Sequence, residues 1–232
     1  MNLAIMQPYF LPYIGYFQLL NAVDKFVLYD DVNFINRGWV NRNTMLLGGK
    51  PHLFTLPLIN ASQNRLIYEV EVSQDTAWRK KTLKTFQQAY QKAPQFQVVF
   101  PLLEEIIYLE AADIADLVYQ SLVLLKGYLG IETELVRTSR MYENAELKAQ
   151  ARILDICKKE GATRYINPIG GQELYKKDLF QEQGIQLNFI KSTLHPYPQF
   201  KNAFVPWLSI LDVLMFNDLG SVRELLQDFE LV

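Results

Sequence analysis

The chain has 232 residues, half of them hydrophobic, which is sufficient for the core of one globular domain. Its formal net charge of -2 at pH 7 gives no overall reason to expect nucleic acid or an anionic membrane as a partner. The sequence shows no run long enough to span a membrane and no secretory leader, and its single Cys157 cannot form an intrachain disulfide, so we expect a cytoplasmic protein.

The start of the chain predicts a strand, a turn, a helix and a second strand. The apolar run Leu3–Met6 stops at Pro8, which cannot donate a hydrogen bond to a neighbouring strand. Pro12 suits the first turn of a helix that extends to Leu20, and Lys25–Tyr29 is a second apolar run. Strand, helix and strand in this order usually imply parallel pairing, so we expect an α/β fold with a mostly parallel sheet flanked by helices.

Ligands of such sheets bind beyond the carboxyl ends of the strands, and here those ends carry polar and aromatic side chains. The candidate residues in this position are Gln7, Tyr9, Tyr13, Asp30 and Asp31. The amide and the phenols can offer hydrogen bonds to a ligand, whereas Asp30 or Asp31 would serve as a general base or a magnesium ligand.

A polar cluster follows the second strand, and its candidate ligand contacts are Arg37, Trp39, Asn41, Arg42 and Asn43. Arginines bind phosphate or carboxylate groups bidentately, amides recognise hydroxyls, and a tryptophan stacks on a base or a sugar. If the segment is extended from Trp39 onward, Trp39, Asn41 and Asn43 share one face. The alternative is a polar hairpin whose arginines pair with the two aspartates.

The middle of the chain predicts mainly supporting elements, with one further candidate at the end of a strand. In order, the elements are a hairpin turn at Gly48–Pro51, strands at 52–58 and 66–72, a helix reaching about Lys92, two helices within 101–130, and a strand at 131–137. The lysines of the first of these helices suit a solvated flank. Ser139 follows the last strand and would project over the same crevice as Gln7, and the alternative is an ordinary turn residue.

A second turn between a strand and a helix contains two glycines. A helix over 145–160 and a strand over 163–167 precede Gly170 and Gly171, and a helix over 172–183 follows them. Glycines let the backbone approach a ligand, and a helix start exposes unpaired amide groups. The pair is therefore a candidate anion or backbone-contact site.

The tail that begins at Lys191 is predicted to be a loop and a helical extension of a single domain spanning 1–232. Its proline-rich segment suits an ordered loop, and Tyr197 and Gln199 are candidate ligand contacts there. His195 is the better of the two histidines for general acid or base work, and the alternative is an ordinary surface histidine.

Two helices are expected in the tail, over 208–216 and 221–229. Asp212 is a lone acid among the apolar residues of the first. Because a buried acid needs a partner, we expect Asp212 to bind a hydroxyl, an amide or an arginine.

Several motifs in combination resemble the signature of the WbqC-like family, and together they cover nearly the whole chain. They are Gln7–Phe17, Asp30–Val32, Arg37–Asn43, Tyr165–Gly171, Tyr197–Phe200 and Ser209–Asp212. Members of that family are associated with gene clusters for bacterial O-antigen and other surface polysaccharides. The resemblance implies a role in those pathways, and transfer of an amino acid such as glycine to a sugar has been suggested for the family.

The order of strand, proline-containing turn, helix, strand and acid also resembles the Rossmann-like opening of the nucleotidyltransferase and pantothenate-synthetase group, which binds ATP in that turn. Those enzymes usually carry two histidines there, and this sequence has none. The likeness implies ATP or another nucleotide with magnesium as cofactor. Arg37, Arg42 or the metal would then stabilise a phosphoryl transition state.

Together the residues and the resemblance predict an aminoacyl, acyl or nucleotidyl transferase of surface-polysaccharide precursor synthesis. Its substrate would be a nucleotide-linked sugar or an activated acyl donor, held by Arg37 and Arg42 against a ring-stacking wall of Trp39 and Tyr9. No nucleophile, metal-ligand cluster or complete phosphate loop is visible. The alternative is a noncatalytic protein that binds a nucleotide sugar or a partner enzyme, while the acidic balance disfavours single-stranded nucleic acid.

Overall fold

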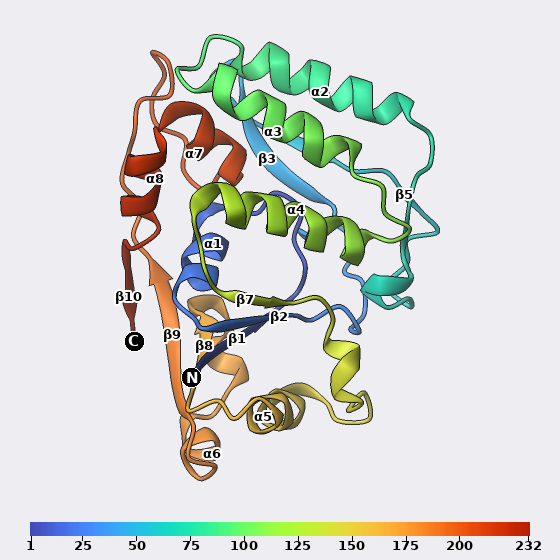
Figure 1. The fold of residues 1–232 in the computed structure, drawn as a ribbon, viewed down its shortest axis with the longest axis vertical. Helices are drawn as coiled ribbons and strands as arrows, with labels where there is room; N and C mark the ends of the chain where they lie inside the picture. Colours follow the sequence, from blue (N-terminus) through green and yellow to red (C-terminus); the bar gives the residue numbers. More distant parts are fainter.

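The computed structural model describes residues 1–232 and has a six-stranded sheet at its centre (Figure 1). Its strands are β1 (Asn2–Met6), β2 (Lys25–Leu28), β7 (Glu134–Val136), β8 (Arg164–Pro168), β9 (Gln186–Ser192) and β10 (Phe229–Leu231). Their order is β10-β9-β8-β1-β2-β7, and all neighbours are parallel except β10, which runs antiparallel to β9. The predicted α/β fold with a mostly parallel sheet is confirmed.

The central strand, β1, is buried on both faces. Leu3 and Ile5 belong to one hydrophobic cluster and Ala4 belongs to the other. A strand covered on both faces consists of consecutive apolar residues, which explains why the run at the start of the sequence could be recognised.

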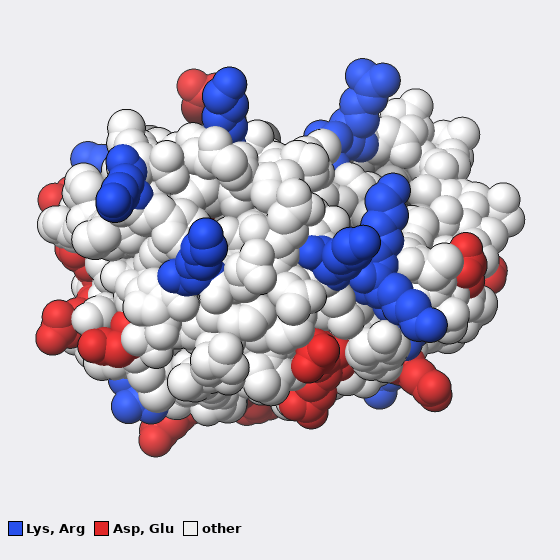
Figure 2. Space-filling model, turned by 90° about the horizontal axis from the view of Figure 1, so that it is seen from above, with Lys and Arg blue, Asp and Glu red and all other residues white.

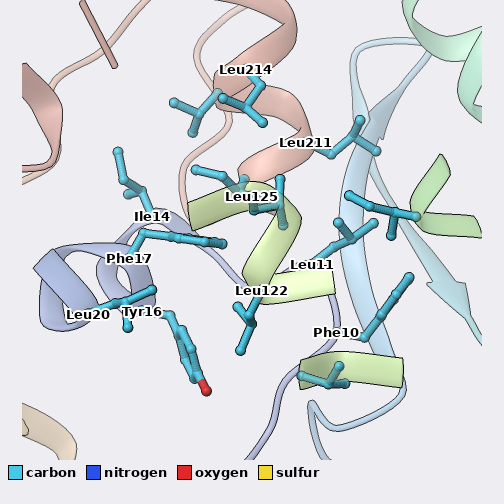
Figure 3. Packing of buried hydrophobic residues seen from close by; sticks show 14 of the residues in the cluster. Phe10, Leu11, Ile14, Tyr16, Phe17, Leu20, Leu122, Leu125, Leu211 and Leu214 are labelled. Atoms are coloured by element: carbon cyan, nitrogen blue, oxygen red, sulfur yellow. The ribbon is translucent and has the colours of Figure 1, made fainter. Parts of the chain in front are cut away.

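Helices cover both faces of the sheet (Figure 1). On one face lie α1 (Ile14–Asn21), α4 (Ile114–Leu129), α7 (Ile210–Phe216) and α8 (Leu219–Leu225), with α2 (Ala77–Tyr90) and α3 (Phe96–Tyr108) packed beyond them. On the other lie α5 (Ala149–Lys159) and α6 (Lys177–Gln181). Phe17 of α1, Leu125 of α4 and Leu214 of α7 share the larger core cluster (Figure 3).

The order of the strands reverses beside β1. Its partner β2 lies on one side, whereas β8, much later in the chain, pairs with its other side. In open α/β sheets, ligands bind beyond the carboxyl ends of the strands at such a reversal. The segment that leaves β1 toward α1 therefore lies at the position where a ligand site is expected.

Two short hairpin-like pairs complete the fold. β3 (Arg42–Leu47) and β4 (Lys50–Thr55) are antiparallel and are joined by Gly48 and Gly49, whose φ angles are 59° and 76°. Two consecutive residues with positive φ form the turn that suits a two-residue hairpin, so the predicted turn is confirmed. β5 (Leu58–Ile59) pairs in the same antiparallel manner with β6 (Glu71–Val72).

Two predictions for the first third of the chain are wrong. Pro12 lies outside the helix, because Leu11 adopts a positive φ of 44° and α1 begins only at Ile14. Of the expected strand over 66–72, only β6 (Glu71–Val72) forms, and the 3-10 helix η1 (Ile67–Glu69) precedes it, because the Ile67 and Tyr68 amides donate to carbonyl groups of the segment that follows β2 rather than to a partner strand.

Three helix predictions also differ from the structure. α3 begins at Phe96, upstream of Pro101. The expected helix over 172–183 is split into the 3-10 helix η3 (Ile169–Leu174) and α6, because Tyr175 between them is extended and packs on Tyr165 and Phe180. The last predicted helix ends early, because the unpaired edge of β9 takes up the end of the chain as β10.

No helix combines the length and the hydropathy needed to cross a bilayer.

Figure 2 looks down on the end of the molecule where α2 and α3 lie, and it shows Lys and Arg side chains spread over a largely uncharged face. Lys80, Lys81 and Lys84 of α2 are exposed, so the predicted solvated flank is confirmed.

Candidate functional site

A pocket of about 230 Å³ opens beside the connection from β1 to α1. Its lining residues are Tyr9, Tyr13, Trp39, Asn43 and Trp207. Four of these five had been selected from the sequence, so the structure brings that group together. Trp207 was not selected, although it closes the side of the pocket next to Tyr13, with a distance of 6.0 Å between the two ring centres.

Backbone hydrogen bonds fix the connection that carries the two tyrosines. The Leu11 carbonyl accepts from Asn43 Nδ2 at 3.0 Å and from Ser209 Oγ at 2.6 Å. The Pro12 carbonyl accepts from the Ile210 amide at 2.7 Å. This irregular connection is therefore held by the starts of β3 and α7, and that anchoring sets the positions of the Tyr9 and Tyr13 rings.

The hydroxyl groups of Tyr9 and Tyr13 have no hydrogen-bond partner within the protein. By contrast, the buried hydroxyl of Tyr16 donates to the Gln7 carbonyl at 3.0 Å. Burial raises the pKa of both Tyr9 and Tyr13 above the usual value of 10.0, so both phenols are neutral at physiological pH. The pocket thus presents two free hydroxyls that can donate to and accept from a ligand.

The segment that carries Trp39 is less extended than expected, because β3 begins only at Arg42. Trp39 is 48% exposed, and the Arg42 guanidinium lies 5.9 Å from the centre of its ring. Arg42 Nε donates to the Gly38 carbonyl at 2.9 Å, and its terminal nitrogen donates to the Arg37 carbonyl. Neither Arg37 nor Arg42 forms an ion pair, and Asp30 and Asp31 instead pair with Arg140 and Arg152. The alternative hairpin interpretation is therefore wrong about the partners of these arginines, although Arg42 does begin a hairpin strand.

Asp30 is buried at the end of β2, with 1% of its surface exposed. Thr138 Oγ1 donates to both of its carboxylate oxygens at 2.9 Å, and the Ser139 amide donates at 3.0 Å. Burial raises the pKa of Asp30, and these hydrogen bonds partly oppose the rise. Asp30 therefore fixes the segment that leaves β7, next to the exposed Arg140, which lies 3.5 Å away.

Asp31 is held by two buried groups, the Ser139 hydroxyl and the Arg152 guanidinium of α5. Arg152 also lies over the Tyr29 ring at 4.9 Å. Every carboxylate oxygen of Asp30 and Asp31 thus has a donor within the protein, and no group of three or more His, Cys, Asp or Glu side chains is placed to hold a metal. The predicted magnesium role does not fit these side chains.

The other candidates lie outside the pocket lining, and they are Gln7, Arg37, Asn41, Arg42, Ser139, Gly170, Gly171, His195, Tyr197 and Gln199. The Asn41 amide donates to the Leu56 carbonyl at 2.8 Å. Gly170 has open space around it, whereas a Cβ atom on Gly171 would overlap the Asn167 amide. His195 is exposed, and its Nε2 atom contacts the Asp228 carboxylate.

The predicted partners of Asp212 are confirmed. Its carboxylate accepts from the hydroxyls of Tyr90 and Tyr197, both at 2.8 Å, and from Gln199 Nε2 at 2.6 Å. Burial raises the pKa of Asp212, and its three donors partly oppose the rise. Tyr197 and Gln199 therefore face this carboxylate.

Two residues of this region were missed in the sequence. Trp207 follows Pro206 in an irregular segment, and a large aromatic ring placed in a loop was the available signal. Arg152 lies among the apolar positions of α5, where a charge needs a buried partner.

Comparison with known proteins adds a family and one relative. The model of the WbqC-like protein family matches residues 7–224. The chain is 31% identical over 220 residues to the uncharacterized protein Rv1507c of Mycobacterium tuberculosis, and the alignment covers 93% of each chain. No solved structure matches.

Proposed function

The chain belongs to the WbqC-like protein family, and we propose that it binds a sugar-containing ligand. The observation that carries this proposal is the pocket of four aromatic rings with two free tyrosine hydroxyls. A sugar ring has apolar C–H faces that stack on aromatic rings and hydroxyls that bind polar edges. At about 230 Å³ the pocket suits a compact group rather than a whole nucleotide.

Two arginines close to Trp39 in the chain support a phosphate-linked sugar. Arg37 is exposed without an ion pair, and Arg42 lies beside the face of Trp39. Guanidinium groups bind phosphate bidentately, and an exposed tryptophan can stack on a base. A nucleotide-linked sugar would place its sugar among the four rings, its phosphates near Arg37 and its base over Trp39.

Binding without catalysis is the first candidate, because the structure leaves no acidic side chain free beside the pocket. Transfer of an aminoacyl or acyl group to the sugar, in surface-polysaccharide precursor synthesis, is the second. The position of the pocket favours this second candidate. The pocket lies beyond the carboxyl end of β1, where the strand order reverses, and α/β enzymes bind their ligands at such a position. In that case Asp30, Asp31 or His195 would supply the base.

A thermal-shift screen tests the binding proposal. The ligands are UDP-sugars and dTDP-sugars, the same nucleotides without sugar, ATP, CTP and acyl-CoA, each with and without magnesium. A ligand at a concentration of 100 times its Kd stabilises the native state by about 2.7 kcal/mol, which raises the melting temperature measurably. We expect a shift with a sugar nucleotide that exceeds the shift with its nucleotide alone.

Two variants locate the ligand. Tyr13→Phe removes one free hydroxyl and should weaken binding of the sugar nucleotide while leaving binding of the bare nucleotide unchanged. Arg37→Ala should weaken both. Equal shifts with and without the sugar would contradict the proposal, and so would the absence of any shift.

The two candidates differ in turnover. If the protein is a transferase, Asp30→Asn or Asp31→Asn should abolish transfer from an acyl donor while the folded variant retains its affinity for the sugar nucleotide. Mass spectrometry of the sugar nucleotide after incubation with acyl donors measures this. An unmodified sugar nucleotide in the presence of every donor would favour binding alone.

A further inference from the structure

Trp207 reaches the pocket from the loop between β9 and α7, which we call the tryptophan loop, residues 193–208. This segment contains no helix and no strand of the sheet. Phe200 and Trp207 within it have positive φ angles of 55° and 61°, a conformation that bulky side chains rarely adopt. Such strain persists only where surrounding contacts impose it, so the anchors of the loop are informative.

The main anchor of the tryptophan loop is the carboxylate of Asp212 in α7. Asp212 accepts from Tyr197 and Gln199, both of which belong to the loop. Gln199 in turn closes the loop on itself, because its side-chain oxygen accepts from the Val205 amide at 2.6 Å and its nitrogen donates to the Val205 carbonyl at 3.1 Å. Through Gln199, Asp212 therefore holds the part of the loop at Val205, two residues before Trp207.

The same carboxylate is also linked to the strand that carries another lining residue of the pocket, Asn43. Tyr90 of α2 donates to Asp212 and accepts from the Leu46 amide of β3 at 2.8 Å. β3 is the strand that carries Asn43, and Trp39 lies just before it. Through its three donors, Asp212 thus contacts the loop that carries one tryptophan and, by way of Tyr90, the strand next to the other.

Burial of the Asp212 carboxylate costs free energy of folding. Asp212 is fully buried, and its neighbours in α7 are apolar. A buried carboxylate loses its hydration and is tolerated only with a full set of donors. An apolar residue would pack with the rest of α7 without that requirement, but it could not hold the three donors.

We propose that Asp212 is a positioning residue of the pocket, whose carboxylate holds the tryptophan loop so that Trp207 lines the pocket beside Tyr13. Its effect on ligand affinity rests on the function proposed above. Its effect on Trp207 does not, because the position of that side chain can be measured without any ligand.

The test uses Trp207 as the only fluorescent tryptophan, in a Trp39→Phe/Trp78→Phe background. Acrylamide quenching of its emission is measured with Tyr197→Phe and with Asp212→Asn. Tyr197→Phe keeps the carboxylate and two of its donors, so it provides a folded variant in which one anchor of the loop is lost. Tyr142→Phe is the matched control, because Tyr142 belongs to the core cluster on the other face of the sheet and its hydroxyl donates to Glu160.

We expect Tyr197→Phe and Asp212→Asn to raise the quenching constant of Trp207, since the freed loop opens locally, but by less than about twofold, because this residue is already 55% exposed. Tyr142→Phe should leave it unchanged. With the natural tryptophans restored, the two loop variants should also weaken binding of the sugar nucleotide by about tenfold. A Trp207 signal that is the same in Tyr197→Phe as in the parent protein would overturn the proposal.

The outcomes separate this inference from the proposed function. Altered quenching in a protein that binds no sugar nucleotide supports the positioning role and refutes the sugar site. An equal change in the Tyr142→Phe control refutes the positioning role, because the response then reflects general loosening of the core.

Discussion

Gly15, at the second position of α1, is a residue whose lack of a side chain bears directly on the pocket. A Cβ atom there would overlap the Tyr13 ring and would lie 2.5 Å from Ser192 Oγ. Gly15→Ala should therefore displace Tyr13 and weaken binding of the sugar nucleotide by about tenfold, or 1.4 kcal/mol. Isothermal titration calorimetry measures this change.

The control for Gly15→Ala is another helical glycine. Gly127 is exposed in α4 and has open space around its Cβ position, so Gly127→Ala should stabilise the fold by about 0.5–1 kcal/mol and leave affinity unchanged. If Gly15→Ala binds as tightly as the parent protein, Tyr13 is not a ligand contact.

At the scale of elements, the ion pair between Arg152 and Asp31 joins α5 to the end of β2. Both side chains are almost completely buried, at 4% and 7% exposure. Arg152→Met should lower the free energy of unfolding by about 3–5 kcal/mol, because it leaves a buried carboxylate without its cation. Urea denaturation followed by circular dichroism measures the loss.

Arg137→Met provides the comparison for that ion pair. Arg137 pairs with Asp116 at 2.6 Å but is 61% exposed, so its removal should cost less than about 1 kcal/mol. Similar small losses in both variants would show that the Asp31 carboxylate is accommodated without Arg152.

Elements that depend on local pattern were predictable, and elements that depend on distant contacts were not. The β1 and β2 strands are apolar runs, and α1 and α4 have helical spacing, so each carries its own signal. β10 forms only because the edge of β9 is free, and its sequence had suggested the end of a helix. η3 interrupts a helical pattern because Tyr175 packs against the core.

The residues of the candidate site also divide into those that the sequence indicates and those that only the fold brings together. Tyr9, Tyr13 and Trp39 could be selected because the chain order places them after strands of a parallel sheet. For Trp207 the sequence offers only a large aromatic ring in a loop, and no local pattern indicates that this ring contacts the first turn of the chain. The donors that occupy Asp30 and Asp31 come from residues far along the sequence, and only the fold brings them there.

At the scale of the whole molecule, two sets of carboxyl groups give opposite pH dependence. Burial raises the pKa of Asp30 and of Asp212, so their contribution to stability is greatest below the unfolded value of about 3.8 and is lost as pH rises through the folded values. Glu160 behaves differently. Burial alone would raise its pKa, but hydrogen bonds from Lys25 and Tyr142 outweigh burial and lower it.

Glu160 should therefore stabilise the fold above its unfolded value of about 4.5 and lose that effect as pH falls through its folded value. We expect Glu160→Gln to be less stable than the parent protein near pH 7, with a difference that shrinks in acid. Urea denaturation between about pH 3 and pH 7 measures both proteins. A difference that is independent of pH would show that the effect of Glu160 is not due to its charge.

The pairing of β1 with β8 has a consequence for synthesis. The amino group of Met1 bonds Thr163, 162 residues away, and the wall formed by Trp207 comes later still. On the ribosome the first strand gains its second neighbour only when β8 (Arg164–Pro168) has been made, and contacts of such separation slow folding. A nascent chain therefore exposes one edge of its central strand until β8 has emerged, and the pocket is complete only when Trp207 has been made as well.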